Sequence, residues 1–328
     1  MTDPSPIPES STEPRIVAIV PSFNGGSYLR PCIESLINQI PVRPRIIVVD
    51  DGSTDKSIEN LQDLIDSGVI EIHRNPCNMG RANSVNQIFE SLCADYFILQ
   101  DADDLAKTER VARQVAFMEQ NSDVACSSSF VDYISADGSH VAKGKLDLLD
   151  DARLTEYLAG DEPFGLFCPA VILRASVVKD PELRFRGQFW PADDIDLWNR
   201  IAEKGFKVRA QPENLVKYRI HGNSAVTSGF AKTRMQFEWL RACLRARRSG
   251  QPELTKDEFL ALWHAAPWWQ RVNRARKFLA KGYYRAAGFA VAERSYLKAA
   301  VKCAIAVLLQ PGYSLRRAAT QLRGRLFQ

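Results

Sequence analysis

The first 110 residues alternate between short apolar runs and segments that carry apolar residues on one face. The apolar runs are rich in β-branched and aromatic residues and end at polar turn residues, as buried parallel strands do; they cover residues 16–20, 46–49, 69–72 and 96–99. The segments between them have helical periodicity over residues 27–39, 55–65 and 82–93. This alternation predicts an α/β fold with a Rossmann-like, mostly parallel central sheet flanked by helices.

The pattern changes along the rest of the chain. Residues 124–134 are predicted as a further strand, residues 135–145 as a polar loop, and residues 194–204 as a helix that ends at Gly205. The N-terminal segment is polar, rich in Pro and Ser, and lacks the apolar stretch of a signal peptide. We therefore expect a disordered segment over residues 1–14, one α/β domain over 15–228 that carries the chemistry, and a basic helical extension over 229–328.

Charge is distributed unevenly along the chain. The 43 Lys and Arg nearly balance the 39 Asp and Glu, which argues against a generic nucleic-acid binder. Residues 231–328, however, contain 20 Lys and Arg but 5 Asp and Glu, whereas the first 230 residues contain 23 and 34. The seven cysteines form no C-x-x-C pair, and no apolar run is long enough for a transmembrane helix. We therefore expect a cytoplasmic protein with an acidic body and a basic C-terminal region.

Acidic residues follow the second and fourth predicted strands. Residues 50–55 read DDGSTD and residues 101–104 read DADD, so two strands of one parallel sheet deliver carboxylates to one edge. Asp-Gly-Ser is also a common turn and helix cap, and Asp-x-Asp alone is a weak signal. Both motifs together, at strand ends of the same sheet, favour a site for a divalent cation and phosphate oxygens.

Several ordered motifs resemble those of family 2 glycosyltransferases, which have the GT-A fold and use nucleotide-diphosphate sugars. The resemblance rests on residues 19–24 (IVPSFN), 48–55 (VVDDGSTD) and 101–104 (DADD), and on Asn78 and Gly80 followed by Asn86. Val85 stands where the family has an arginine; Arg81 is the candidate substitute, and a solvated arginine is the alternative. The resemblance continues in residues 190–200, where Asp193 replaces the usual Glu, and in residues 218–224 (YRIHGNS).

This resemblance implies an inverting glycosyltransferase of the hexosyltransferase type, with Asp194 as the general base and a UDP-sugar as the favoured donor. By the same resemblance, the donor is bound by Pro21, Ser22, Asn24, Asp51, Gly80, Arg81, Asn86 and Asp101. A Mn²⁺ or Mg²⁺ ion is held by Asp103, Asp104 and His221, and an acceptor hydroxyl, on a glycan or a lipid-linked sugar, meets Trp190, Asp193 and Arg219. Three structural alternatives stay open: a structural His221, a core Trp198 and an ordinary ion pair between Asp196 and Arg200.

Two other classes of function compete with this interpretation. A nucleotidyltransferase is disfavoured because the Asn24-Gly25-Gly26 turn has no neighbouring cluster of Lys and Arg. A non-catalytic module of the same fold that binds nucleotide sugars or glycans is the remaining alternative. For the basic extension we consider a helical subdomain with a solvated basic face, contact with an anionic membrane surface, and homo-oligomerisation. Nucleic acid is not an expected partner.

Overall fold

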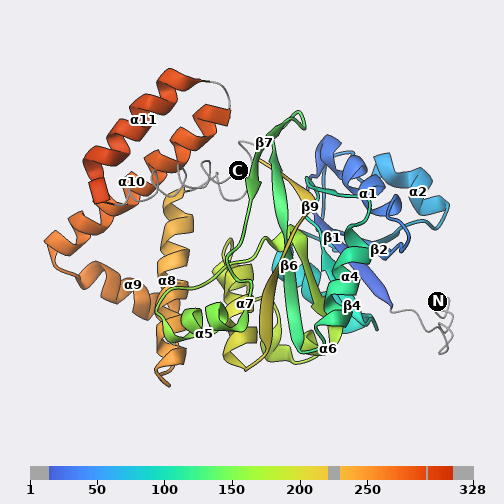
Figure 1. Ribbon diagram of the computed structural model, residues 1–328, viewed down its shortest axis with the longest axis horizontal. Helices are drawn as coiled ribbons and strands as arrows, with labels where there is room; N and C mark the ends of the chain where they lie inside the picture. The colour runs from blue at the N-terminus through green and yellow to red at the C-terminus, as the bar shows by residue number, and fades with distance from the viewer. Residues whose placement is uncertain (1–14, 221–229, 293–294, 313–328) are drawn as a thin grey trace. The chain divides into compact units, whose positions relative to one another are not determined.

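The computed structural model describes residues 15–220, 230–292 and 295–312, so the predicted N-terminal disordered segment and His221 lie outside the described residues. The chain forms two compact units (Figure 1). The first comprises Met1–Gly222 and Leu244–Gln251, and the second comprises Asn223–Cys243 and Pro252–Gln328. The predicted domain limit at residue 228 stays a prediction.

One sheet organises the first unit. Within the described residues its strands lie in the order β3-β2-β1-β4-β8-β6-β9-β5, with β7 paired to β6. The half that precedes β8 is parallel throughout, as predicted, and contains β1 (Ile16–Ser22), β2 (Arg45–Asp50), β3 (Glu71–Arg74) and β4 (Tyr96–Leu99). The other half mixes parallel and antiparallel pairs and contains β5 (Leu105–Ala106), β6 (Val124–Ile134), β7 (His140–Gly144), β8 (Val171–Arg174) and β9 (Lys207–Arg219).

Helices connect the strands near the predicted positions, with shifted ends. The first unit contains α1 (Leu29–Ile37), α2 (Gln62–Asp66), α3 (Arg81–Ser91), α4 (Arg110–Gln120), α5 (Asp151–Ala159), α6 (Ala175–Val178) and α7 (Asp193–Glu203). Short 3-10 turns lie at Gly26–Tyr28, Glu59–Leu61, Cys168–Ala170, Pro181–Leu183 and Gly187–Phe189. The prediction of a loop over 135–145 was wrong, because β7 occupies part of it and pairs with β6 as a hairpin.

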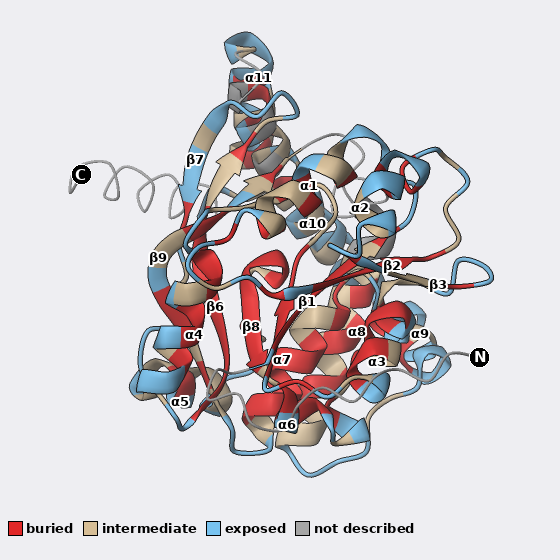
Figure 2. Cartoon of the chain, turned by 90° about the vertical axis from the view of Figure 1, so that its right-hand side faces the viewer, coloured by how far each residue is buried: buried red, intermediate tan, exposed pale blue. Residues whose placement is uncertain are grey.

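Apolar residues cover both faces of the parallel strands. In β1, Val17 and Ile19 belong to one buried cluster, whereas Ala18 and Val20 belong to the other. Helices α3 and α7 contribute to the first cluster, and α1 and α4 to the second, so the buried strands run through the middle of the unit (Figure 2). Trp198 on α7 is fully buried in the first cluster, which confirms its core role. This double cover explains why the strands are continuous apolar runs.

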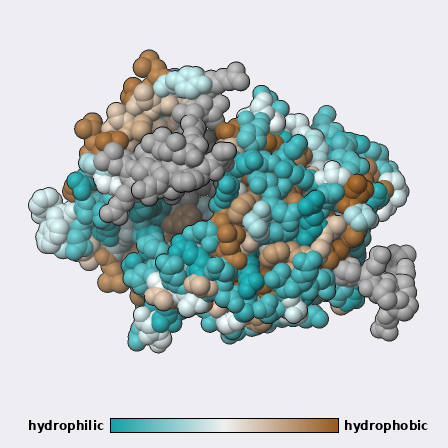
Figure 3. Space-filling view, in the orientation of Figure 1, coloured by the Kyte–Doolittle hydropathy of each residue, from teal (hydrophilic) through white to brown (hydrophobic). Residues whose placement is uncertain are grey.

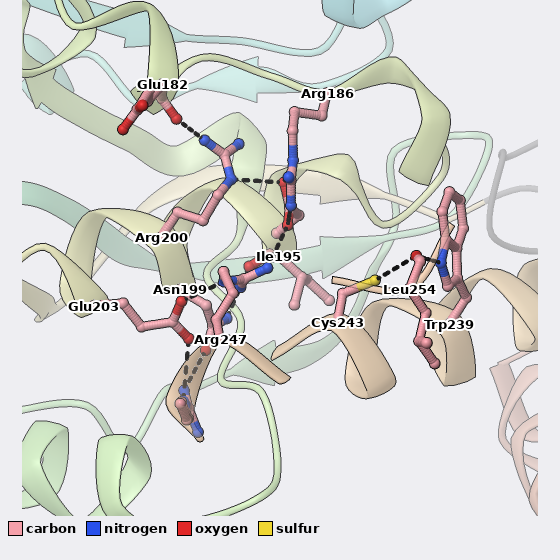
Figure 4. Close-up of polar contacts among 12 residues, drawn as sticks. Glu182, Arg186, Ile195, Asn199, Arg200, Glu203, Trp239, Cys243, Arg247 and Leu254 are labelled. Carbon is pink, nitrogen blue, oxygen red and sulfur yellow. Dashed lines mark hydrogen bonds and ion pairs between the residues drawn. The ribbon is translucent and has the colours of Figure 1, made fainter. Parts of the chain in front are cut away.

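The second unit is helical in its described part. It includes the first part of α8 (Phe230–Arg248), together with α9 (Lys256–Ala265), α10 (Trp268–Ala292) and α11 (Tyr296–Leu309). Thr255 starts α9 with a capping box, in which its hydroxyl accepts from the Glu258 amide while the Glu258 carboxylate accepts from the Thr255 amide. The Trp239 indole donates to the Leu254 carbonyl at 2.8 Å and ties α8 to the segment before α9 (Figure 4). In the part of the chain described here, every helix is too short or too polar to cross a bilayer.

Candidate active site

The loops that follow β1 and β2 are joined by the side chain of Asn24. Its Oδ1 accepts from the backbone amides of Thr54 at 2.7 Å and Asp55 at 3.2 Å. The backbone amide of Asn24 donates to Ser53 Oγ at 3.0 Å. Asn24 has φ +53°, a left-handed conformation that asparagine tolerates better than most residues. Predicted as a donor-binding residue, Asn24 therefore holds the two loops together at the carboxyl ends of their strands.

Asp51 is buried and accepts three hydrogen bonds from the segment that leads into α3. Its Oδ1 accepts from Asn75 Nδ2 at 2.8 Å and from the Met79 amide at 2.9 Å, and its Oδ2 accepts from the Gly80 amide at 2.8 Å. Gly80 has φ +83° immediately before the helix, a conformation that glycine adopts without strain. Asp51 and Gly80 are thus brought together as predicted donor-binding residues, and the carboxylate fixes the loop around them.

Pro21 and Ser22 lie at the end of β1, opposite Val49 and Asp50 of β2. Ser22 is buried, and its hydroxyl has no hydrogen-bond partner among the described residues. The Ser22 carbonyl accepts from the Asp51 amide at 2.8 Å. Both residues therefore border the same sheet edge as Asp51.

The DADD segment after β4 is held by the end of β9. The amide of Arg219 donates to Asp104 Oδ1 at 2.6 Å, and Arg219 Nε donates to the carbonyl of Asp103 at 2.8 Å. Burial, together with the neighbouring carboxylates of Asp103 and Asp101, raises the pKa of Asp104 well above its usual value. Asp104 is buried, while Asp101 and Asp103 are partly exposed.

Arg219, predicted to meet the acceptor, is buried and directed toward the protein. Besides the Asp103 carbonyl, its guanidinium donates to the carbonyls of Ser135 at 3.1 Å and Ala136 at 2.9 Å, and it lies 4.7 Å from the centre of the Tyr28 ring. This geometry favours a role in positioning the DADD segment over a direct acceptor contact.

Asn86, predicted to bind the donor, pairs with the backbone of Phe185. Its Nδ2 donates to the Phe185 carbonyl at 2.8 Å, and its Oδ1 accepts from the Phe185 amide at 3.0 Å. Both polar ends of the amide are therefore occupied. Asn86 anchors the loop that continues to Trp190, and a donor contact by this side chain stays a prediction.

Arg81 links the carboxylates of two distant segments. Its Nη2 donates to Asp193 Oδ1 at 3.0 Å, and its Nη1 lies 4.0 Å from Asp101 Oδ1 and 2.8 Å from Cys168 Sγ. The guanidinium also lies 5.2 Å and 5.4 Å from the ring centres of Phe185 and Trp190, distances typical of cation–π contacts. Its side chain is 15% exposed, so the alternative of a solvated arginine was wrong.

Two adjacent carboxylates begin α7. Asp193 is fully buried and bound by Arg81, whereas Asp194 is partly exposed and its Oδ1 accepts from the Ile195 amide at 2.7 Å. Burial, and then the negative charge of Asp193, raise the pKa of Asp194 to about 7, against the lowering effect of Arg81. Asp194 is thus a carboxylate that accepts a proton near neutral pH, as a general base requires.

Asp196, two residues further on, is surrounded by three arginines. Figure 4 labels these arginines, which are Arg186, Arg200 and Arg247. It is fully buried; Arg186 Nε donates to its Oδ2 at 2.8 Å, Arg200 Nε donates to the same atom at 2.9 Å, and Arg247 Nη1 lies 3.6 Å from Oδ1. The ion pair between Asp196 and Arg200, which the sequence left open as an alternative, is present. The sequence carried no signal for Arg186 and Arg247, because neither lies one helical turn from Asp196.

The end of α8 reinforces this anchor within the first unit. Arg247 Nε and Arg248 Nε donate to the two carboxylate oxygens of Glu203, at 2.6 Å and 3.1 Å. Arg248 also donates to the carbonyls of Tyr157 and Gly160. The helix that carries Asp193 and Asp194 is therefore anchored at two further positions, Asp196 and Glu203.

Two predictions remain, the acceptor residue Trp190 and the metal ligands. Trp190 is 44% exposed and borders the Arg81 guanidinium. Among the described residues, no three His, Cys, Asp or Glu side chains are close enough to hold a metal ion by themselves, and His221 is not described. The donor set at the DADD segment is nevertheless one of hard carboxylate oxygens beside the loops after β1 and β2, which suits Mg²⁺ or Mn²⁺ with further oxygens from a ligand.

Comparison with known proteins agrees with this architecture. The family model described as "Glycosyl transferase family 2" matches residues 17–179. An uncharacterized glycosyltransferase of Haemophilus influenzae is 31% identical over 221 residues, which cover 64% of this chain and 67% of that protein. The Escherichia coli UDP-Glc:alpha-D-GlcNAc-diphosphoundecaprenol beta-1,3-glucosyltransferase WfaP is 28% identical over 65% of this chain and 80% of its own length.

A solved structure is similar over nearly the whole chain. The mannosyltransferase PcManGT of Pyrobaculum calidifontis, in complex with GDP-Man and Mn²⁺, superposes with a TM-score of 0.53, covering 95% of this chain and 81% of its own, at 16% identity. At this identity the likeness concerns the fold, which is the predicted GT-A arrangement of a mixed sheet with helices. The sequence matches show that this chain is an enzyme that belongs to glycosyltransferase family 2.

Proposed function

We propose that this enzyme transfers a hexose from a nucleotide-diphosphate donor, with a UDP-sugar favoured, to a hydroxyl of a glycan or lipid-linked acceptor, with inversion at the anomeric carbon. In a single displacement, the acceptor oxygen attacks the anomeric carbon as the bond to the diphosphate breaks. The acceptor hydroxyl loses its proton to a base, and the nucleoside diphosphate leaves as an anion. The protein must therefore supply a proton acceptor for the hydroxyl and positive charge for the departing diphosphate.

Asp194 carries the proposal, because its raised pKa of about 7 makes it a competent proton acceptor at neutral pH. It is held by the Ile195 amide at the first turn of α7. Arg81 connects this turn to Asp101, the first residue of the DADD segment after β4. The turn that carries the proposed base and the proposed donor site therefore share one cation. Such a connection supports a site in which proton removal and departure of the diphosphate occur side by side.

Asp103, with help from Asp104, is the proposed holder of a Mn²⁺ or Mg²⁺ ion, with His221 as a further proposed ligand. When bound, the cation supplies positive charge that stabilises the leaving diphosphate. The chain holds these carboxylates in place through Arg219, which fixes Asp103 by its carbonyl and Asp104 by its carboxylate. Asp51, Gly80, Pro21 and Ser22 are the proposed contacts to the nucleoside, at the adjoining strand ends.

The choice of donor and acceptor rests on the relatives. WfaP is named for UDP-Glc and a diphosphoundecaprenol-linked acceptor, and PcManGT is solved with GDP-Man and Mn²⁺. A UDP-hexose and a lipid-linked acceptor are therefore the first candidates for this enzyme, and envelope polysaccharide synthesis is the process that we propose.

A panel of UDP-, GDP- and dTDP-sugars tests the donor, with thermal shift and sugar-nucleotide hydrolysis measured with and without Mn²⁺. A donor at about 100 times its Kd should stabilise the protein by about 2.7 kcal/mol. We expect the shift with at least one donor, and we expect EDTA to remove hydrolysis until Mn²⁺ or Mg²⁺ is restored. If no nucleotide diphosphate binds in the presence of metal, the proposed reaction is wrong.

Asp194→Asn tests the base with little change of shape, because an amide oxygen still accepts from the Ile195 amide. Transfer should fall by roughly 10²- to 10⁴-fold, whereas the donor-induced thermal shift should persist. Asp66→Asn, at an exposed position of α2, is the matched control and should leave both unchanged. Transfer that survives in Asp194→Asn would assign the base elsewhere, and donor binding without any transfer by the wild type would favour the non-catalytic binding module.

A further inference from the structure

Helix α10 exposes a row of large apolar side chains. Trp268, Val272, Leu279 and Tyr283 follow one another at intervals of four, seven and four residues, which places them on one face of the helix. Trp268 is 72% exposed, and Trp269 beside it is 57% exposed. Side chains of this size are rarely left in water as a continuous row unless a partner covers them.

Helix α11 exposes a second apolar row. Leu297, Val301 and Leu308 lie on one face at helical spacing, and Leu297 and Leu308 are 81% and 82% exposed. Tyr296, at the start of the helix, is 68% exposed. Hydrophobic residues gather over this helix in the space-filling view (Figure 3).

Helices α10 and α11 pack against each other and form a helix pair (Figure 1). Small side chains are buried within this helix pair, namely Ala280, Ala287, Ala290, Ala299 and Ala306. Small buried side chains of this kind allow two helices to approach closely. Leu297 and Leu308 of α11, and Trp268 of α10, nevertheless stay exposed.

Basic residues border the apolar rows. Residues 268–312 contain nine Lys and Arg but a single acidic residue, Glu293. Arg271, Arg276 and Lys277 on α10, and Lys298 on α11, are exposed. Arg274, in contrast, is engaged within the unit, since it lies 4.0 Å from the centre of the Trp263 ring and donates to the Trp263 carbonyl.

We propose that the outer face of the α10–α11 pair docks on an anionic membrane surface, with Trp268, Trp269, Leu297 and Leu308 entering the headgroup region. Exposed tryptophans, an apolar helix face and neighbouring cations are the features that bind this interface. Two copies of the same basic face would repel each other, and nucleic acid offers no apolar phase for the leucines. The inference goes beyond the proposed sugar transfer and does not depend on it.

Vesicle sedimentation of the full chain tests the surface. The protein should bind vesicles that contain phosphatidylglycerol more tightly than vesicles of phosphatidylcholine alone, and binding should weaken as salt is raised. Leu297→Glu with Leu308→Glu should lower binding at least tenfold, by an order-of-magnitude expectation for placing charges at a lipid interface. Gln270→Glu, on the other side of α10, is the control for added charge and should have a smaller effect.

The basic rim and the tryptophans have separate tests. Arg271→Gln with Arg276→Gln should weaken binding to anionic vesicles by about fivefold per residue removed. Brominated lipid should quench the tryptophan fluorescence of the wild type, and Trp268→Phe with Trp269→Phe should lose most of this quenching. Circular dichroism of each variant establishes that it is folded.

Three outcomes would overturn the proposal. These are absent binding of the folded wild type to anionic vesicles, equal binding by Leu297→Glu/Leu308→Glu, and a dimer in light scattering that these two substitutions dissociate while vesicle binding is absent. The last result would assign the face to a second copy of the chain. Vesicle binding is measured without substrate, so its result does not change if the proposed sugar transfer is wrong.

Discussion

Arg81 at the start of α3 donates to Asp193 at the start of α7, with 3.0 Å between Nη2 and Oδ1. The same guanidinium lies 4.0 Å from Asp101, so one cation faces both the strand end of the proposed donor site and the turn that carries the proposed base. Phe185 and Trp190 flank it. Because Arg81 also lowers the pKa of Asp194, its loss should change catalysis in a way that pH reveals.

Arg81→Gln should move the acid limb of the transfer rate to higher pH. Without the cation, the charged form of Asp194 loses a favourable interaction, so its pKa rises from about 7, and a shift of about one pH unit is expected. Arg81→Lys keeps the charge and should shift the limb less. Arg113→Gln, which removes an exposed ion-paired arginine, is the control. An unchanged pH profile in Arg81→Gln would contradict the electrostatic link, even if the rate fell.

The wild-type enzyme should itself show an acid limb near pH 7. The base acts when deprotonated, and its folded pKa is about 7, so kcat/KM should fall tenfold for each pH unit below that value. The measurement is initial transfer rate between pH 5 and pH 9 at subsaturating acceptor. A rate that stays constant down to pH 5 would exclude Asp194 as the titrating base.

Asp196→Ala should destabilise the first unit strongly. The substitution leaves Arg186 and Arg200 without the buried carboxylate that they share, and breaking such a cluster costs about 3–5 kcal/mol. Asp123→Ala removes an exposed partner of Lys207 and should cost about 1 kcal/mol or less. Urea unfolding followed by circular dichroism compares the two. If Asp196→Ala and Asp123→Ala had equal free energies of unfolding, the buried cluster would stabilise the protein no more than an exposed ion pair does.

Gly52→Ala should be more harmful than Gly68→Ala, although both glycines have positive φ, +76° and +69°. At position 68 nothing lies within 4 Å of an added Cβ, so the cost is the backbone strain of about 1 kcal/mol. At position 52 the Cβ would lie 2.8 Å from the carbonyl carbon of Cys77, which adds overpacking and gives a total of about 3 kcal/mol. Thermal unfolding measures both. Gly52→Ala should also weaken donor binding, because Asp51 holds the same segment.

Hydrophobic periodicity predicted the buried strands well and the exposed ones poorly. The strands predicted over residues 96–99 and 124–134 match β4 and β6, whose side chains are mostly buried. In β7, by contrast, three of the five residues are exposed, so the segment had no apolar signal and was predicted as a loop. Its strand conformation comes from hydrogen bonding to β6, a partner that local sequence does not reveal.

The sequence by itself determined which residues end the strands and therefore which carboxylates share one edge of the sheet, because parallel buried strands have continuous apolar runs with a defined end. Only the tertiary structure decided what those side chains do. Arg81 and Asp193 are 112 residues apart in the chain, and Asp196 draws arginines from three segments. Such contacts form because burial removes a charged group from solvent and stabilises it only where side chains of opposite charge from other segments lie close, a condition that local periodicity does not encode.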